Sequence, residues 1–300
     1  MTIQVSELAN KDLPIIARLL NEEYKGSYDF IPFSEERILS EIRKRSLKVL
    51  IARENRKVLG VIGTHTHAEE RLEEHISWLA AHEGHNQRII ENMLVNEIEK
   101  NAKGNIVSTM VDEGNPRIDD WINRGYVLYP GFQRMSAKLD GLKPIPELAE
   151  GFKLRSLRPD EEEKLVAVIN AGFGWQRLEQ GVLDTWQSED PPFNEDWVQV
   201  AEIGERIVSA VVAKPDTDYV KYLHFKRGHL GPAATLPEFR NKHLASALTA
   251  KAMSFLFEKG MDSVRLGTSE ENISSITLLR SLGFQVDIVR KALRKELKSA

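Results

Sequence analysis

Apolar and polar positions follow the same order in the two halves of the chain. Each half opens with a short apolar strand, continues with an amphipathic helix behind an acidic residue, and then shows two β-rich runs. A further strand, a polar loop, a long helix and a short strand follow in both halves. We expect these elements near residues 3–5, 12–21, 48–53, 57–66, 76–81, 88–100 and 106–111, and again near 152–154, 160–170, 198–202, 207–213, 228–236, 242–259 and 263–268. This order predicts an α/β (α+β) fold in which each half is a mixed, mainly antiparallel twisted sheet flanked by helices.

The two halves also keep a nearly constant register, which indicates an internal duplication. Matching positions are 154, 157 and 158 residues apart in the pairs Asn86 and Arg240, Asn115 and Asn272, and Gly125 and Gly283. Between the halves, Pro144 and Pro146 lack an N–H donor and favour extended backbone before them, so a regular element is not expected to cross them. We predict two domains, residues 1–140 and 151–300, with a linker at residues 141–150.

Composition narrows the function. The chain has 41 Lys and Arg against 45 Asp and Glu, a net charge of −4, which argues against a general nucleic-acid binder. Because there is no cysteine, disulfides, thiolate metal sites and a cysteine nucleophile are excluded. No apolar run approaches the roughly 18 residues of a membrane span, and the first residues lack the order of a signal peptide. We expect a cytoplasmic protein that binds neither nucleic acid nor membrane; its oligomeric state stays open.

The segment 231–248 carries the strongest chemical signal. A strand runs into Thr235, Pro237 ends it, and no acidic residue occurs between Phe239 and Glu258. The start of a helix exposes unpaired N–H donors and a partial positive charge, which natural helices usually complement with Asp or Glu. Arg240 at this helix start, with short side chains after it, instead suits a phosphate or pyrophosphate. The alternative is a solvated basic helix start with an alanine-rich packing face.

This loop resembles that of a known family. The run Arg240-Asn-Lys-His-Leu-Ala245 resembles the Gln/Arg-x-x-Gly-x-Gly/Ala acyl-CoA loop of the GCN5-related N-acetyltransferase (GNAT) superfamily. Downstream, Asn272-Ile-Ser-Ser-Ile-Thr-Leu-Leu-Arg-Ser-Leu-Gly-Phe284 resembles the superfamily's Asn…Leu-Gly-Phe helix. The resemblance covers nearly all of the second half and extends weakly to the first. The chain is therefore similar to tandem acetyltransferases, an arrangement also found in mycothiol synthase.

The resemblance implies a role for each matching residue. The backbone of residues 233–235 would hydrogen-bond the acyl carbonyl and the pantetheine arm beside a splayed strand pair, and the N–H groups of residues 241–246 would hold the pyrophosphate. Arg240 and Lys242 would add positive charge, and the Asn272 side chain would contact the pantetheine. The implied acetyl-CoA-binding residues are Ala233, Ala234, Thr235, Arg240, Asn241, Lys242, His243, Leu244, Ala245, Ser246 and Asn272.

Two positions depart from the family pattern. His243 replaces the first glycine of the loop, and we expect a helical φ there that tolerates histidine. Leu279 stands where the family often has a tyrosine that acts as general acid towards the leaving thiolate. The usual acid is therefore absent, and its role is unfilled or supplied elsewhere.

The corresponding loop of the first half is altered more strongly. Glu91 is expected to place a carboxylate where the pyrophosphate would lie, and Ile89 replaces a small residue with a branched one. We expect the first half to keep the fold but to lack the loop contacts that bind the cofactor. A second working site with an altered loop is the alternative, because helix starts bind anions in several ways.

Several side chains are candidates for the chemistry. Without a cysteine relay, an amine would attack the thioester directly in a ternary complex, and it would need a base. The candidates are His229, which shares a strand face with the cofactor loop, His224 slightly earlier, Glu202 at the end of a strand, and Glu271 before Asn272. For each candidate, a hydrogen-bonded strand histidine or a solvated carboxylate is the alternative.

Other groups have weaker signals. His65, His67, His75, His82 and His85 could supply zinc ligands, but their spacing fits no known pattern and we expect no metal. The aromatic residues Trp175, Trp186 and Trp197 line an acceptor pocket or belong to the core. The acidic run 161–163 is expected to be a solvated helix cap.

The leading hypothesis is an acetyl-CoA-dependent N-acetyltransferase with its active site in the second half and a primary amine as acceptor. A small amine metabolite is favoured over a protein N-terminus or lysine. The rival hypothesis is a non-catalytic acyl-CoA-binding sensor or scaffold, which the absence of the usual acid at Leu279 supports.

Overall fold

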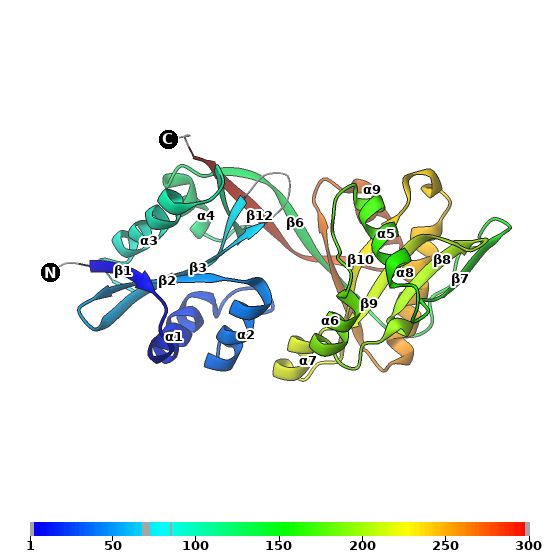
Figure 1. Ribbon diagram of the computed structural model, residues 1–300, viewed down its shortest axis with the longest axis horizontal. Helices are drawn as coiled ribbons and strands as arrows, with labels where there is room; N and C mark the ends of the chain where they lie inside the picture. The colour runs from blue at the N-terminus through cyan, green and yellow to red at the C-terminus, as the bar shows by residue number, and fades with distance from the viewer. Residues whose placement is uncertain (1–2, 68–72, 85, 298–300) are drawn as a thin grey trace. The chain divides into compact units, whose positions relative to one another are not determined.

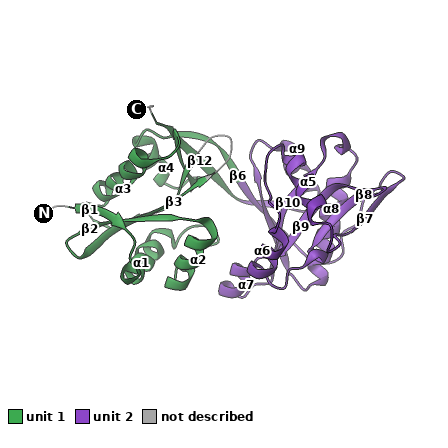
Figure 2. Ribbon diagram, in the orientation of Figure 1, with its two compact units in different colours: residues 1–132, 288–300 green, residues 133–287 purple. Residues whose placement is uncertain are grey.

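A computed structural model describes residues 3–67, 73–84 and 86–297 and divides the chain into two compact units (Figure 2). Unit 1 comprises Met1–Phe132 and Ile288–Ala300, and unit 2 comprises Gln133–Asp287. Each unit is a mixed, mostly antiparallel sheet flanked by helices, which confirms the predicted fold class. No helix in the described parts of the chain is long and apolar enough to cross a membrane.

Unit 1 has the strand order β1-β2-β3-β4-β5-β12, in which only the β4–β5 neighbours are parallel. Alternate strand residues face α1 on one side and α3 on the other, so the sheet has a separate core on each face (Figure 1). Its elements in chain order are β1 (Ile3–Glu7), α1 (Leu13–Tyr24), α2 (Glu35–Arg45), β2 (Lys48–Glu54), β3 (Lys57–His67), β4 (Glu73–Ala81), α3 (Gln87–Asn101), β5 (Ile106–Asp112) and α4 (Arg117–Asn123).

Unit 2 repeats this plan with the order β7-β8-β9-β10-β11-β6, and its parallel neighbours are β10 and β11. Helix α8 is apolar over most of its surface because it is buried against this sheet. The elements are β7 (Phe152–Ser156), α5 (Glu162–Phe173), α6 (Val182–Glu189), β8 (Val198–Ile203), β9 (Arg206–Pro215), α7 (Thr217–Leu223), β10 (Arg227–Thr235), α8 (Leu244–Glu258), β11 (Ser263–Ser269) and α9 (Ile273–Ser281).

The two closing strands, β6 (Val127–Lys138) and β12 (Gln285–Glu296), each run from one unit into the other. Leu293 of β12 is fully buried in the core of unit 1, and Met135 of β6 is fully buried in the core of unit 2. The compact units therefore differ from the expected division into 1–140 and 151–300, because each half gives its last strand to the other. No helix or strand occurs in residues 141–150.

Close contact between β6 and β12 depends on Gly131. A Cβ at this position would lie 1.7 Å from the carbonyl oxygen of Arg290, a backbone atom that cannot move away without shifting β12. Replacing Gly131 by alanine should lower the free energy of unfolding by about 2 kcal/mol or more, as overpacking does. Urea denaturation measures this change.

Gly141→Ala is the matched control, because a Cβ at Gly141 would meet nothing within 4 Å. Equal urea midpoints for the two variants would contradict the close approach of the two strands.

Candidate functional site

Strand β10 separates from β11 in the middle of the unit 2 sheet. Over these fully described strands, the parallel pairing ends at His229 and Arg265, although both strands continue. On the other side, the pairing of β10 with β9 shifts register between Leu230 and Ala233. Gly231, inside this bulge, has a φ of +134°, which side-chain-bearing residues rarely adopt. The split strand pair that the family resemblance implies is present at this point.

Beyond the split, β10 is paired with β9 and no longer with β11. The N–H of Leu236 donates to the carbonyl oxygen of Val208, at 2.9 Å, on the side of β9. Because successive residues of a strand point their backbone groups to opposite sides, those of Ala233 and Thr235 point away from β9. An extended chain such as a pantetheine arm could pair with this edge as an added strand.

The loop between β10 and α8 contains two left-handed residues. Asn241 and His243 have φ values of +61° and +60°, and Lys242 between them is not left-handed. Left-handed residues in a short loop can turn backbone N–H groups to one side, as in the nests that bind anions, so the N–H groups of this loop are candidates for a phosphate site. The expected helical φ at His243 is wrong: the residue keeps the left-handed backbone that glycine favours, at a cost of order 1 kcal/mol.

The start of α8 is suited to an anion. Its first turn contains no acidic residue, and His243 before it makes no side-chain cap to the helix N–H groups. Ala245 in this turn is exposed, so little side-chain volume covers the backbone. The Nη2 of Arg240 donates to the carbonyl oxygen of Gly172 in α5, at 2.8 Å, so this guanidinium is anchored beside the loop. Residues 233–235 at the end of β10 and residues 240–246 at the start of α8 are joined by a short loop with a 3₁₀ turn at Pro237–Phe239.

Asn272 and its neighbours follow the end of β11. The Oδ1 of Asn272 accepts a hydrogen bond from the Ser275 N–H at 3.1 Å, so the side chain caps α9. Glu271 is exposed in the preceding turn, and Leu279 is buried in the core of unit 2. A role of Glu271 as base stays a prediction, and the position of the family's tyrosine carries no hydroxyl.

His229 lies between two cations on adjacent strands. It is directly opposite Lys214 on β9 and Arg265 on β11, so the three side chains lie on the same face of the sheet. The Nδ1 of His229 is buried, and no described residue forms a hydrogen bond with it. The Nε2 lies 3.6 Å from where a Cβ of Gly231 would be, so the ring extends along β10 towards the bulge.

The surroundings of His229 strongly disfavour its protonation. Burial, with the positive charges of Arg265, Lys214, Arg134 and Arg227, lowers the pKa of His229 from 6.5 to about 3. The imidazole is therefore neutral at physiological pH. Residues 214 and 265 had no signal in the sequence, because only the strand register brings them beside His229.

Carboxylates hold these cations in place. The Nε of Arg227 donates to the Oδ2 of Asp216 at 2.7 Å, and the Nη2 of Arg265 donates to the Oδ1 of the same carboxylate at 3.2 Å. The Nζ of Lys214 donates to Asp190 at 2.8 Å and lies 5.0 Å from the centre of the Trp186 ring.

The structure places Glu202 away from His229. Glu202 is opposite Ile207, seven residues before Lys214 on β9, which is about 23 Å along a strand. Its Oε2 accepts a hydrogen bond from the Nε of Arg155 at 2.7 Å. His224 lies outside β10, just after α7.

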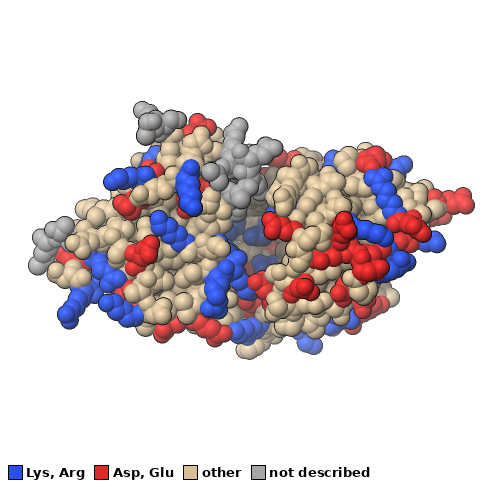
Figure 3. Space-filling view, viewed as in Figure 1, with Lys and Arg blue, Asp and Glu red and all other residues tan. Residues whose placement is uncertain are grey.

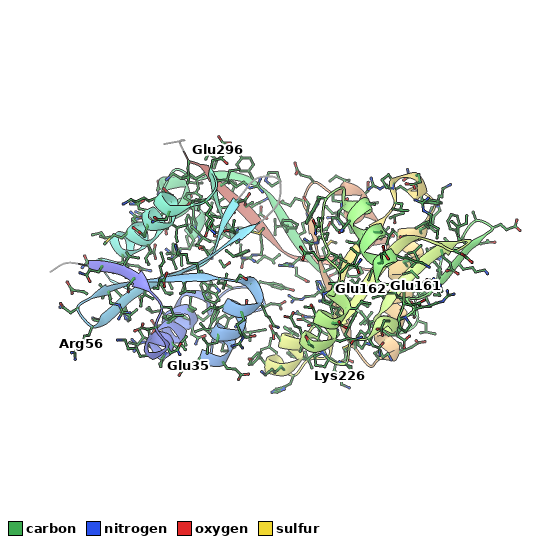
Figure 4. The ribbon with its side chains drawn as sticks, viewed as in Figure 1. Glu35, Arg56, Glu161, Glu162, Lys226 and Glu296 are labelled. Atoms are coloured by element: carbon green, nitrogen blue, oxygen red, sulfur yellow. The ribbon has the colours of Figure 1, made fainter. Side chains whose placement is uncertain are left out.

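The acidic residues at the start of α5 are not all solvated, contrary to expectation. Glu161 is 1% exposed and accepts a hydrogen bond of 2.6 Å from Arg155. Burial raises the pKa of Glu161, but hydrogen bonds from Arg155 and from the Arg158 N–H outweigh burial, and its pKa lies at about 2. Acidic side chains gather on this face of unit 2 in Figure 3, and Figure 4 labels Glu161 and Glu162.

Unit 1 has a histidine at the corresponding strand position. His75 is opposite His65 and Ser108, and the register of β3 and β4 shifts around Ser77. Unlike His229, His75 has a hydrogen-bond partner for Nδ1, the Oγ of Ser108 at 3.0 Å, and His65 pairs with Ser77 in the same way. Both units therefore share the bulge and the histidine. The row of Lys214, His229 and Arg265 on neighbouring strands, called the cationic row below, belongs to unit 2.

Glu91 does not point at a cofactor loop, which corrects our expectation. It is 1% exposed and accepts hydrogen bonds of 2.8 and 2.9 Å from Arg117 and of 2.7 Å from Arg124. These bonds tie α3 to α4. Ile89, by contrast, is 56% exposed. That unit 1 lacks the loop contacts that bind the cofactor stays a prediction.

The remaining groups are mostly structural. Among the described residues no cluster of three or more His, Asp or Glu could hold a metal ion; His85 and the side chain of His67 lie outside the description. Trp197 is buried in the core and Trp186 largely so, whereas Trp175 is partly exposed. Because Trp186 contacts Lys214, it also borders the row around His229.

Comparison with known proteins shows which family this chain resembles. Residues 155–284 match the sequence model of the acetyltransferase (GNAT) family. The mycothiol acetyltransferase of Thermobispora bispora is 31% identical over 161 residues, which are 50% of this chain and 52% of the relative. That of Renibacterium salmoninarum is 25% identical over 173 residues, 53% of this chain and 49% of the relative. The chain spans about half the length of these relatives in the matched regions.

Solved structures share the fold along the whole chain. A tandem GNAT protein from the clavulanic acid biosynthesis pathway has a TM-score of 0.72 at 15% identity and covers 100% of both chains. A GCN5-related N-acetyltransferase from Sphaerobacter thermophilus has a TM-score of 0.73 at 16% identity, covering 99% of this chain and 96% of the other. These structures show the shared fold, whereas the family match and the mycothiol acetyltransferase relatives confirm the resemblance stated from the sequence motifs.

The pKa of His229 can be measured by NMR titration of its ring signals, and it should lie near 3. The unfolded chain binds a proton at this histidine near pH 6.5, so stability should fall as the pH decreases from about 6.5 towards 3. His229→Asn should remove this part of the pH dependence. Titration of the His229 ring near pH 6.5 would contradict the cationic, buried environment.

Relief of backbone strain gives a second prediction. His243→Gly should raise the free energy of unfolding by up to about 1 kcal/mol, because glycine adopts a φ of +60° without a steric penalty. Lys242→Gly is the control, since its backbone is not left-handed and extra flexibility should lower stability. Chemical denaturation of both variants decides, and a destabilised His243→Gly variant would oppose the assignment.

Proposed function

Because residues 155–284 match the GNAT acetyltransferase family, we propose that this chain is an acetyl-CoA-dependent N-acetyltransferase whose cofactor site lies in unit 2. One observation carries the proposal. The part of β10 that has left β11, the left-handed residues 241 and 243, and the start of α8 without an acidic residue follow in this order along the chain, with a 3₁₀ turn at Pro237–Phe239 after β10. They offer a strand partner for an amide-bearing arm and N–H donors for a diphosphate, in the order in which coenzyme A presents these groups.

The chain's own residues would divide the work. Bound acetyl-CoA supplies the acetyl group as a thioester. The N–H groups around His243 and at the start of α8 hold its phosphates, and the Ala233 and Thr235 edge orients the arm. Strand N–H groups near the bulge would donate to the thioester oxygen. With no cysteine in the chain, the amine nitrogen attacks directly, and orientation accounts for much of the rate gain.

Proton transfer is the demanding part of this mechanism. The amine must lose a proton, and His229 is the histidine that faces the split between β10 and β11. With a pKa of about 3, it is a weak base in the free protein. We propose that His229 lines the acceptor site, while Glu202 serves the Arg155 cluster and not the reaction.

A second candidate function rests on Leu279. Leu279 is buried in the core, and a leucine has no hydroxyl to act as the usual acid. This favours a module that binds acyl-CoA without transferring the acyl group. The acceptor is proposed to be a small amine. Release of free CoA with a panel of amines separates the two functions, since the binding module would take up acetyl-CoA without turnover.

The cofactor cradle can be tested by charge alone. Ala245→Glu should weaken CoA binding by about tenfold or more, because a carboxylate in the first turn of α8 opposes the phosphates. The isosteric Ala245→Gln variant should bind CoA nearly as tightly as the wild type. Isothermal titration calorimetry gives both affinities, and equal binding by the Glu and Gln variants would move the phosphate site elsewhere.

A further inference from the structure

We infer that the acyl acceptor of unit 2 carries an anionic group, a carboxylate or a phosphate, close to its amine, and that Lys214 and Arg265 hold this group on either side of His229. This inference rests on the proposed transferase function and names the substrate class of the same site.

The geometry brings both cations within reach of one ligand. Lys214, His229 and Arg265 are in register on three neighbouring strands, which are about 4.8 Å apart. Arg134 adds a further cation on the same face: its Nη1 would lie 2.9 Å from a Cβ at Gly267, two residues after Arg265. Absence of a side chain at Gly267 therefore makes the room that this guanidinium uses.

Two carboxylates hold three of these cations: Asp190 pairs with Lys214, and Asp216 pairs with both Arg227 and Arg265. Asp216 is shared by two guanidinium groups, those of Arg227 and Arg265, so one negative charge serves two positive ones. Arg227 is also buried, with its guanidinium carbon 3.2 Å from the centre of the Tyr219 ring. Cations whose side chains are already held by carboxylates suit recognition of an anion, because little side-chain entropy is lost on binding.

The cationic row lies next to the proposed reaction site. The His229 ring extends towards Gly231, at the bulge from which β10 departs from β11. An acceptor whose anionic group lies between Lys214 and Arg265 would therefore present its amine beside the proposed thioester position.

Binding of such an acceptor would also raise the pKa of His229. The positive charges around the ring are part of the reason why its pKa is low. A bound anion offsets these charges and raises the pKa of His229, so that the imidazole becomes a better proton acceptor when the correct substrate is present. Neutral amines would leave His229 a weak base. The selection for anionic acceptors would thus act on both binding and proton transfer.

Matched pairs of amines test this inference. With acetyl-CoA, kcat/KM should be at least about tenfold higher for β-alanine than for β-alaninamide, or for phosphoethanolamine than for ethanolamine, a difference of about 1.4 kcal/mol. The pair with the larger ratio identifies the carboxylate or the phosphate as the preferred group. Lys214→Met and Arg265→Gln should reduce the ratio towards one, mainly through KM.

Lys226→Met is the control, because it removes one exposed positive charge at the surface of unit 2, where Figure 4 labels Lys226. Its ratio should equal that of the wild type. Equal kcat/KM values for anionic and neutral amines would overturn the inference and leave the transferase function intact.

A second readout does not need turnover. NMR titration of the His229 ring in the wild-type protein should show a higher pKa with β-alanine or phosphoethanolamine than with the neutral partner of each pair. An unchanged ring pKa with both anionic amines would also refute the inference. Failure of acetyl-CoA to bind in calorimetry would instead refute the proposed function, and the ring titration would still decide the anion site.

Discussion

The structure of the site depends on a single departure of backbone from the sheet. Strand β10 must stay paired with β9 on one side while it leaves β11 on the other, and both conditions hold from the bulge at Gly231 onwards. A register shift alone would only kink the strand. The φ of +134° at Gly231 lets the chain turn and resume its pairing with β9 at Ala233. Every group assigned to the cofactor lies downstream of this point, and His229 lies immediately before it.

The two units differ in how the histidine beside the strand bulge is surrounded. In unit 1, the histidine beside the bulge is satisfied by Ser108, and Glu91 locks the following helix to α4. In unit 2, the corresponding His229 keeps a buried nitrogen without a hydrogen bond from a described residue, among cations. Unsatisfied polar groups and like charges reduce stability, and proteins tolerate them mainly at functional sites. This contrast favours unit 2 as the centre of the chemistry.

The sequence predicted the parts of the fold and site that local patterns encode. The order of elements, the repeat and the loop after β10 follow from hydrophobic periodicity and from contiguous residues such as Arg240 and Ala245. The row around His229 depends on strand register, which joins residues far apart in the chain, and no local signal marks Lys214 or Arg265. The same limit applies to Arg155, whose pairing with Glu202 gives this candidate base another role.

Backbone conformation was also beyond local reasoning. A histidine at a helix start suggests a right-handed residue, but His243 is left-handed, a backbone conformation that glycine adopts without a steric penalty. Exchange of β6 and β12 was invisible for a different reason. Alternating apolar residues define which face of a strand is buried, but not which of two similar sheets receives it.

This exchange affects the order in which the strands of each unit become available during synthesis. Strands β1 to β5 leave the ribosome early, yet the core that they form lacks Leu293 until almost the whole chain has been translated. Unit 1 thus spends most of its synthesis with an uncovered strand edge, a state that invites aggregation. Although most of its residues come first, unit 1 receives its last strand, β12, only after the residues of unit 2 have been synthesised.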